Sequence, residues 1–276
     1  IPEPFYANYD TFAAACGVKV VPVSSTIDSN FSLPPIEAIE ATINEKTRAI
    51  FICNPNNPTG YVYSKKDLND LATLVKKHDL FIIVDEVYRE FTYDGAVHHS
   101  VLTISGLDEH AILVDSMSKR YSMCGARIGC LVSKNKEVMD AALKFAQSRL
   151  SPPTLGLLAS EAAMDEPLNY LEEVTKEYLE RRNTLVGLLQ QIPGIIVSVP
   201  LGAFYCLVQL PVEDTDVFAK WLLTSFNHKG KTVMVAPASG FYGDRNLGKS
   251  LIRIAFVLDI ERLKESVIIL EKALVD

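Results

Sequence analysis

The sequence predicts an α/β protein: a mostly parallel sheet sandwiched by helices, then a smaller C-terminal α+β domain. In the first half, short apolar runs alternate with helical patterns, and this rhythm favours a parallel sheet covered by helices. After Arg149 the pattern changes to a long charged helical segment and shorter strand-like runs. The 276 residues, 48% of them hydrophobic, suffice for two domains with a real core. We place these domains at residues 1–166 and 167–276.

In the first domain, apolar runs rich in β-branched residues are typical of strands that are buried on both faces. Between two of them, Ser64 predicts the start of a helix, because it can cap the helix while Asp67 stands at the third helical position. That helix carries Leu68, Leu71 and Leu74 on one face. The predicted strands are Lys19–Val23, Ala49–Cys53, Phe81–Val84, Ile112–Val114 and Ile128–Val132.

In the second domain, Pro167 begins a long charged helix that ends before Pro193. A later helix, over about residues 215–228, ends near Gly230, a residue type that commonly terminates helices. The remaining predicted elements are strands over Ile195–Val199, Phe204–Leu210 and Leu251–Val257, and a terminal amphipathic helix with Leu263, Val267, Ile268 and Leu270.

Bulk properties exclude several classes of partner. A net charge of −7 argues against nucleic acid or an anionic membrane surface, and no apolar run approaches the ~20 residues that span a bilayer. The five cysteines are scattered without a C-x-x-C spacing, which predicts reduced thiols in a cytoplasmic protein and no zinc site. The opening Ile1-Pro2-Glu3-Pro4 has neither a basic nor an apolar signal region, so we expect no signal peptide.

The strongest candidate for chemistry is Lys119, in the segment Ser116-Met117-Ser118-Lys119. Most lysines are solvated surface charges. This one, however, follows a predicted buried strand, and open α/β sheets bind ligands at the carboxyl ends of their strands. Ser116, Ser118 and Arg127 offer hydroxyl donors and a guanidinium group for a phosphate. An amine in such a setting suits covalent bonding to a carbonyl compound.

Asp85 and the loop that begins at Asn54 are two further candidates. Asp85 ends a buried strand, where a carboxylate needs a cation such as a protonated pyridine nitrogen, and Tyr88 lies close enough to share the site. The alternative for this pair is an acidic loop that opens a helix. The segment Asn54–Gly60 has the composition of a turn, with two X-Pro bonds that allow a cis peptide.

These three segments together resemble the class I and II aminotransferases, which are pyridoxal-phosphate (PLP) enzymes of fold type I. The family's Asn-Pro-Thr-Gly motif is matched by Asn57–Gly60 and its Asp-x-x-Tyr by Asp85 and Tyr88. Its Ser-x-Ser-Lys and Gly-x-Arg-x-Gly are matched by residues 116–119 and 125–129. Because the order and the spacing agree throughout, coincidence is a poor explanation.

The resemblance implies a role for each matched residue. PLP would be the cofactor, bound to Lys119 as a Schiff base, while Asp85 keeps the ring nitrogen protonated. Arg253 would hold the substrate α-carboxylate. The implied catalytic residues are Lys119, Asp85 and Tyr88; the cofactor-binding residues are Tyr6 over the ring, Asn57, Asp85, Tyr88, Ser116, Ser118, Lys119 and Arg127; the substrate-binding residues are Asn57 and Arg253.

Compared with the family, the sequence begins at the aromatic segment Glu3–Tyr9. We therefore expect the large domain to be incomplete here, without the family's N-terminal arm and glycine-rich phosphate loop. We also expect weak cofactor binding and little or no activity from these 276 residues alone, and a homodimer at full length.

Two other patterns are set aside. Gly243–Ser250 satisfies the P-loop pattern for nucleotide phosphates, but a β-like run follows it where a P-loop needs a helix. His98 and His99 are adjacent, so their side chains point apart, and no clustered carboxylates accompany them in the sequence; we predict no metal.

The preferred function is transfer of an amino group between an amino acid, aspartate-like or related, and a 2-oxo acid. A PLP-dependent carbon–sulfur β-lyase would use the same residues and stays open. A non-catalytic or truncated PLP-fold protein also stays open, although the joint presence of Lys119, Asp85 and Arg253 argues against it.

Overall fold

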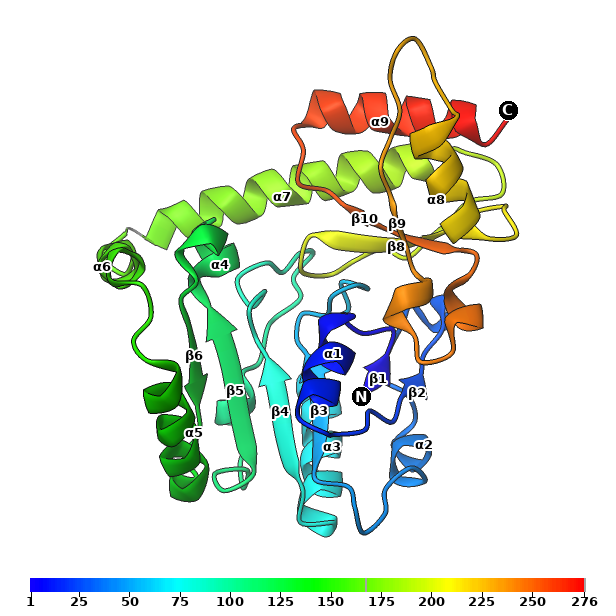
Figure 1. Ribbon diagram of the computed structural model, residues 1–276. Coiled ribbons are helices and arrows are strands. Elements are labelled where there is room, and N and C mark those ends of the chain that lie inside the picture. Colours follow the sequence, from blue (N-terminus) through cyan, green and yellow to red (C-terminus); the bar gives the residue numbers. More distant parts are fainter. Residues whose placement is uncertain (167, 276) are drawn as a thin grey trace.

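The computed structural model describes residues 1–166 and 168–275 and contains two four-stranded sheets (Figure 1). In the first sheet, of order β3-β4-β5-β6, the first three strands are parallel and β6 is antiparallel to β5. The strands are β3 (Ala49–Cys53), β4 (Phe81–Asp85), β5 (Ala111–Ser116) and β6 (Gly129–Val132). This mostly parallel sheet confirms the predicted fold class.

The helix α3 (Lys65–Lys77) connects β3 to β4 and begins as predicted. The Ser64 hydroxyl accepts a hydrogen bond from the Asp67 backbone N–H, and the Asp67 carboxylate accepts one from the Ser64 backbone N–H. This reciprocal cap satisfies two amide groups that the first helical turn leaves unpaired. The apolar face of α3 then packs against Ile82 and Val84 of β4, which are fully buried.

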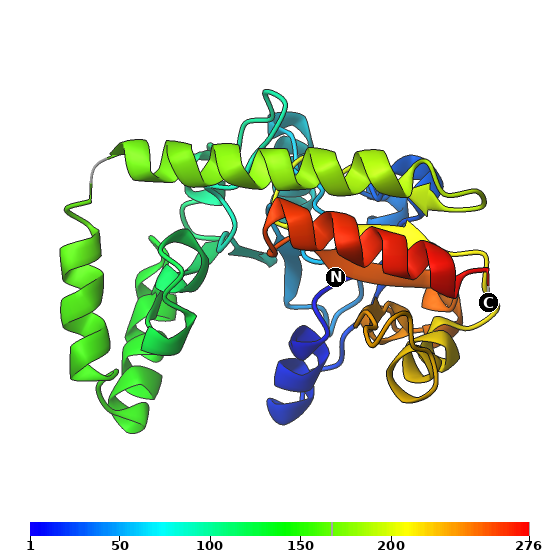
Figure 2. The same cartoon turned by 90° about the horizontal axis from the view of Figure 1, so that it is seen from above.

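The second sheet is antiparallel, of order β7-β8-β10-β9, and lies above the carboxyl ends of β3–β5 (Figure 1). Both faces of its central strand β8 are covered: Cys206 and Val208 pack in the core with helices α7 and α9, whereas Leu207 packs with Phe241 and Tyr242. Figure 2 shows α7 and α9 side by side over this sheet. The elements are β7 (Ile196–Val197), β8 (Tyr205–Gln209), β9 (Ala236–Pro237), β10 (Leu251–Ala255), α7 (Leu168–Leu189), α8 (Thr215–Thr224) and α9 (Ile260–Ala273).

Shorter elements complete the described chain. They are strands β1 (Pro2–Glu3) and β2 (Val23–Ser24), helices α1 (Asn8–Ala15), α2 (Ile36–Glu40), α4 (Met117–Arg120), α5 (Lys136–Arg149) and α6 (Thr154–Ala163), and 3-10 helices η1 (Ile27–Ser29), η2 (Val101–Thr103), η3 (Cys124–Ala126), η4 (Ser239–Phe241) and η5 (Arg245–Gly248). The Asn54-Pro55 and Asn57-Pro58 peptide bonds are cis. The domain division at residue 166 stays a prediction.

The predicted strand Lys19–Val23 is wrong except at its last residue. Val23 and Ser24 form β2, which pairs with the two residues of β1. Pro22 has no backbone N–H to donate, so the pairing starts at the residue after it. The preceding Val21 is 41% exposed, so an apolar residue at this position does not indicate a buried strand.

The predicted helix over residues 215–228 ends earlier, at Thr224. The backbone N–H groups of Ser225 and Phe226 both bond the Trp221 carbonyl, which closes the last turn. Gly230, at φ 81°, lies instead in a tight turn where its N–H donates to the Asn227 side chain. The other strands of the second sheet are each shorter than predicted. The predicted helix start at Pro167 lies outside the described residues.

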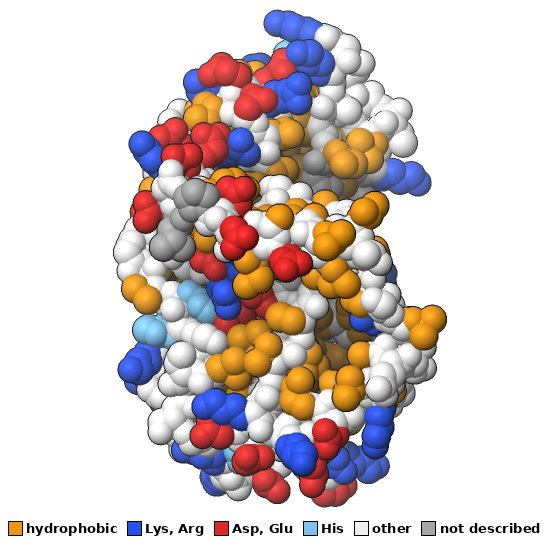
Figure 3. Space-filling view, turned by 90° about the vertical axis from the view of Figure 1, so that its left-hand side faces the viewer, with side chains coloured by type: hydrophobic (Ala, Val, Ile, Leu, Met, Phe, Trp, Pro, Cys, Tyr) orange, Lys and Arg blue, Asp and Glu red, His pale blue; other side chains and the backbone are white. Residues whose placement is uncertain are grey.

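One side of the molecule leaves many apolar side chains exposed. Figure 3 views the molecule from the side of α5, α6 and β6, and hydrophobic side chains gather there. All four residues of β6 are exposed, as are Phe145 and Leu155, at 78% and 81%. Within residues 1–166 and 168–275, no helix is both long and apolar enough to cross a membrane.

Candidate active site

A cavity of about 260 Å³ opens between the carboxyl ends of the parallel strands and the second sheet. Each parallel strand contributes one predicted residue: Asn57 follows β3, Asp85 ends β4 and Lys119 follows β5. Parallel strands bring their carboxyl ends to one edge, which explains why motifs far apart in sequence meet here. The lining residues are Tyr6, Tyr9, Asn57, Asp85, Val87, Tyr88, Lys119, Tyr205 and Arg253.

Asp85 is a partly buried carboxylate held by neutral donors. Its Oδ2 accepts a hydrogen bond of 2.7 Å from the Tyr9 hydroxyl, and its Oδ1 accepts one of 3.1 Å from the Val87 backbone N–H. Burial raises the pKa of Asp85, although these two hydrogen bonds and the Lys119 amine oppose the effect. A cation in the cavity would therefore complement this carboxylate.

Tyr9 is a site residue that the sequence analysis did not assign. Its ring packs against Phe51 with centroids 4.4 Å apart and against Tyr6 edge to face at 5.4 Å. Burial raises the pKa of Tyr9, so the hydroxyl stays a neutral donor to Asp85. The available signal was its position three residues after Tyr6, which lines the cavity as predicted.

Tyr88 faces a second unassigned residue, Tyr205 of β8. Their hydroxyl oxygens are 3.1 Å apart, and the Tyr88 ring packs edge to face on Phe204 with centroids 5.1 Å apart. Burial raises the pKa of Tyr88, which keeps its hydroxyl protonated at neutral pH. The Lys119 Nζ lies 5.9 Å from the centroid of the same Phe204 ring.

Arg253, on β10, reaches the cavity from the second sheet. Its Nη1 donates a 3.0 Å hydrogen bond to the Asn57 side-chain oxygen, across 196 residues of sequence. The guanidinium carbon lies 4.5 Å from the Tyr205 ring centroid and 5.0 Å from that of Phe241. The rings hold the planar group so that it can bind a carboxylate by two parallel hydrogen bonds.

Comparison with known proteins identifies the family. The family model "Aminotransferase class I and II" matches residues 1–268. The chain belongs to the class I and II aminotransferases. A putative aminotransferase of Bacillus subtilis is 34% identical over 99% of this chain and 69% of its own length, and an aspartate aminotransferase of the same organism is 31% identical over 97% and 67%.

Solved structures agree with the fold. The aspartate aminotransferase of Thermotoga maritima matches with a TM-score of 0.88 and 29% identity, over 100% of this chain and 69% of that one. The aromatic aminotransferase of Pyrococcus horikoshii matches with a TM-score of 0.87 and 31% identity, over 99% and 72%. The predicted family, fold and aminotransferase activity are confirmed.

Three predicted cofactor residues of this aminotransferase do not line the cavity. The Ser116 Oγ lies 2.7 Å from the Ser118 Oγ and 3.0 Å from the Ile128 carbonyl, and it caps α4. Arg127 is exposed, at φ 59°, and donates to the Cys124 carbonyl at 2.7 Å. These contacts are local, so the predicted phosphate site stays a prediction.

The patterns set aside earlier do not gain support from the aminotransferase structure. Gly243–Ser250 contains the 3-10 helix η5 and leads into strand β10, so no helix follows the segment at the place where a P-loop requires one. His98 lies 3.5 Å from Glu86. In the described ranges of the chain, no group of three or more His, Cys, Asp or Glu residues is placed to hold a metal ion.

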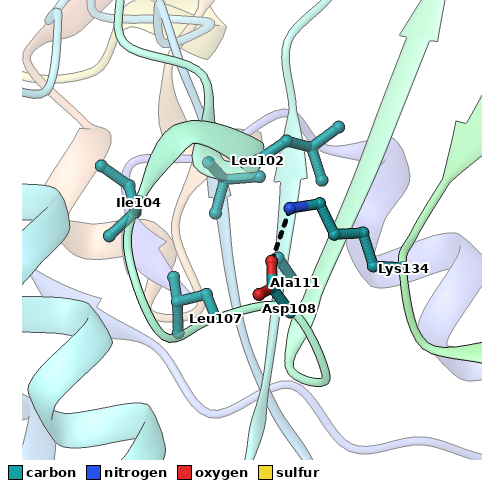
Figure 4. Close-up of a pocket in the computed structure, with 7 residues that line it drawn as sticks. Leu102, Ile104, Leu107, Asp108, Ala111 and Lys134 are labelled. Carbon is teal, nitrogen blue, oxygen red and sulfur yellow. Dashed lines mark hydrogen bonds and ion pairs between the residues drawn. The ribbon is translucent and has the colours of Figure 1, made fainter.

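A second hollow lies at the start of β5, where Ala111 lines it. Its other lining residues include Leu102, Ile104 and Leu107 (Figure 4). The Lys134 amine and the Asp108 carboxylate, 2.6 Å apart, stand at its rim. The hollow has no volume that a water molecule can enter, so it is a packing feature and not a binding site.

Proposed function

We propose that this aminotransferase uses PLP to move an amino group between an amino acid, aspartate-like or related, and a 2-oxo acid. The observation that carries the proposal is the meeting of Lys119, Asp85 and Arg253 in one cavity. Together they offer an amine, a partly buried anion and a guanidinium that suits a carboxylate. Relatives named as aspartate and aromatic-amino-acid aminotransferases support the choice of substrate class.

The chemistry of the lining residues fits PLP at the end of the cavity where Asp85 lies. The two hydrogen bonds to the Asp85 carboxylate come from neutral groups, so a protonated pyridine nitrogen would supply the missing positive charge. The Tyr88 and Asn57 side chains line the same cavity and would donate to a ring hydroxyl. When bound, PLP supplies a ring that accepts negative charge from the substrate α-carbon.

The residues of the chain then act on the substrate. The Lys119 amine would take the proton from the substrate α-carbon and hold it for the later return of a proton to carbon. Arg253 binds the α-carboxylate, and Asn57 orients Arg253 through its 3.0 Å hydrogen bond. The aromatic rings of Tyr6, Tyr9 and Tyr205 line the cavity beside these groups.

Ser116, Ser118 and Arg127 are the proposed phosphate ligands. All three lie on the segment that surrounds Lys119, and their hydroxyl and guanidinium groups suit an anion. Binding would require Arg127 to exchange its Cys124 carbonyl for the phosphate.

We also propose a homodimer in the cytoplasm. The exposed apolar side chains on α5 and α6 support association, since monomers seldom expose so many together. All five cysteines, which lie in the described ranges, are free thiols, and this supports a reducing compartment. Light scattering at several protein concentrations tests the dimer.

The deciding experiment is an assay of the full-length protein against a panel of amino acids with PLP and 2-oxoglutarate, with pyruvate release followed in parallel. Glutamate formed in step with loss of the amino acid supports the proposal. Pyruvate released from cysteine-like substrates without any 2-oxo acid would identify a β-lyase instead. No product from any amino acid would contradict both reactions.

A further inference from the structure

A cluster of four charged side chains lies next to Lys119 and outside the lining of the cavity. We define it as the charged clamp: Arg89, Glu90, Asp115 and Arg120. The Arg120 Nη2 lies 2.8 Å from the Asp115 Oδ2, and the Arg120 Nε lies 3.0 Å from the Glu90 Oε1. Arg89 reaches the same two carboxylates at 3.6 Å and 3.1 Å. None of the four lines the cavity.

The clamp joins the two segments that carry Lys119 and Tyr88 to strand β5. Arg120 is on α4 beside Lys119, Asp115 is on β5, and Glu90 is in the loop that also carries Tyr88. Adjacent helical residues face different directions, so Lys119 points into the cavity while Arg120 points into the clamp. The position of the amine relative to the β4 loop therefore depends on these ion pairs.

Helix α4 needs such an anchor, because it has only four residues. A single turn is unstable by itself in water. The Ser116 hydroxyl holds its first turn by accepting the Ser118 backbone N–H at 3.0 Å, and Arg120 holds its last residue. The Arg120 and Asp115 side chains are only 12% and 8% exposed. Because buried ion pairs add little net stability, a geometric role explains this cluster better than a stabilising one.

We propose that Arg120 is a positioning residue: through Asp115 and Glu90 it sets where the Lys119 amine stands relative to Asp85 and Tyr88. The catalytic part of this inference rests on the proposed function. Arg120→Lys keeps the charge but cannot reach both carboxylates with a planar fork. Arg120→Gln loses the charge as well, so the two variants should form a graded series.

The first test needs no cofactor and no turnover. Reductive methylation of the PLP-free chain with formaldehyde and cyanoborohydride, followed by peptide mass spectrometry, measures the reactivity of each lysine. In Arg120→Gln, we expect the rate at Lys119 to change at least about threefold relative to the exposed Lys65, because the freed turn alters the access of water and reagent to the amine. In the Arg120→Lys variant, the methylation rate at Lys119 should lie between the rates in the unaltered protein and in Arg120→Gln.

The second test measures turnover. A misplacement of about 1 Å costs on the order of 100-fold in rate, so Arg120→Gln should lower kcat by about that factor. The KM for the amino acid should change little, since Arg253 and Asn57 are untouched. The matched control is Arg181→Gln, which removes a partly buried arginine paired with Glu177 at 2.8 Å and should leave both measurements unchanged.

Thermal melting separates the outcomes. If Arg120→Gln does not fold, Asp115→Asn and Glu90→Gln replace it, because both preserve the shape of the side chain. Each should change the reactivity of the Lys119 amine in the same direction as the other. A lower melting temperature with unchanged Lys119 reactivity and unchanged kcat would overturn the proposal. If the unaltered protein shows no transamination but the variants alter Lys119 reactivity, the clamp stands and the proposed function fails.

Discussion

The two ends of the candidate site are held in opposite ways. At one end, Asp85, Tyr88 and Arg253 bond to side chains that are 76, 117 and 196 residues away in the sequence. At the other end, the contacts of Ser116 and Arg127 span 2, 12 and 3 residues. Only the first end is therefore held in place by contacts that the tertiary fold creates, and we call it the prepared end. The second end must exchange local bonds for ligand bonds, at a cost in affinity.

The largest expected effect is at Lys119, which stands between the two ends. Borohydride reduction of the protein with PLP, followed by peptide mapping, should place the pyridoxyl group on Lys119. Lys119→Ala should remove the label and nearly all turnover. Lys134→Ala, which removes a surface lysine paired with Asp108, is the control. Label on any other lysine in the unaltered protein would contradict the assignment.

The next effect tests the prepared end. Asp85→Asn keeps the size of the side chain and removes its charge, so we expect turnover to lose on the order of 3 to 5 kcal/mol of transition-state stabilisation. Tyr9→Phe removes only one hydrogen bond to the same carboxylate and should cost about 1 kcal/mol. Steady-state kinetics measures the loss of turnover in each variant, and the two losses are then compared. Equal effects would show that the charge of Asp85 has no special role.

The locally bonded end should limit cofactor affinity. Arg127→Gln removes the cation proposed for the phosphate, and we expect PLP binding to weaken by about 1.5 to 3 kcal/mol. Absorbance titration with PLP measures this, and titration with pyridoxal, which lacks the phosphate, is the control. We expect the unaltered 276 residues to bind PLP weakly. Tight stoichiometric binding by them would show that this end is also prepared.

Glu86, the neighbour of Asp85 in the sequence, does not line the cavity but should lower the stability of the fold. Glu86 is fully buried, and burial raises its pKa from 4.5 to about 7. Between these values the folded state binds more protons than the unfolded state, so the free energy of unfolding falls as pH rises through this window. At about 1.4 kcal/mol per pKa unit, the loss above pH 7 is at most about 3.5 kcal/mol.

Glu86→Gln should remove that loss. Its oxygen can still accept the 2.8 Å hydrogen bond from the Val101 N–H, and its amide faces the neutral His98, whose pKa burial lowers to about 4. We expect the variant to be about 1 to 3 kcal/mol more stable at pH 8, with a flatter profile between pH 5 and 7. Urea unfolding at several pH values measures this, with the exposed Glu37→Gln as control. A variant less stable than the parent at pH 8 would contradict the argument.

Much of the fold was predictable because its signals are local. The cap of α3 at Ser64 and Asp67 depends on residues three positions apart, and the strands β3–β5 are continuous apolar runs. The predicted strand at residue 19 failed because exposed valines and buried ones look alike without the tertiary context. The helix end predicted at Gly230 was wrong for a similar reason, because a glycine with a positive φ is common in turns as well as at helix ends.

The candidate residues for the chemistry could be predicted from the sequence alone, since Asn57, Asp85 and Lys119 each stand at or after the end of a recognisable strand and parallel strands end at one edge. Only the tertiary structure decided which partners they have. Tyr9 bonds Asp85, Tyr205 faces Tyr88, and Arg120 joins α4 to the β4 loop. These contacts depend on how two sheets and a short helix pack, and nothing in the spacing of residues along the chain encodes that packing.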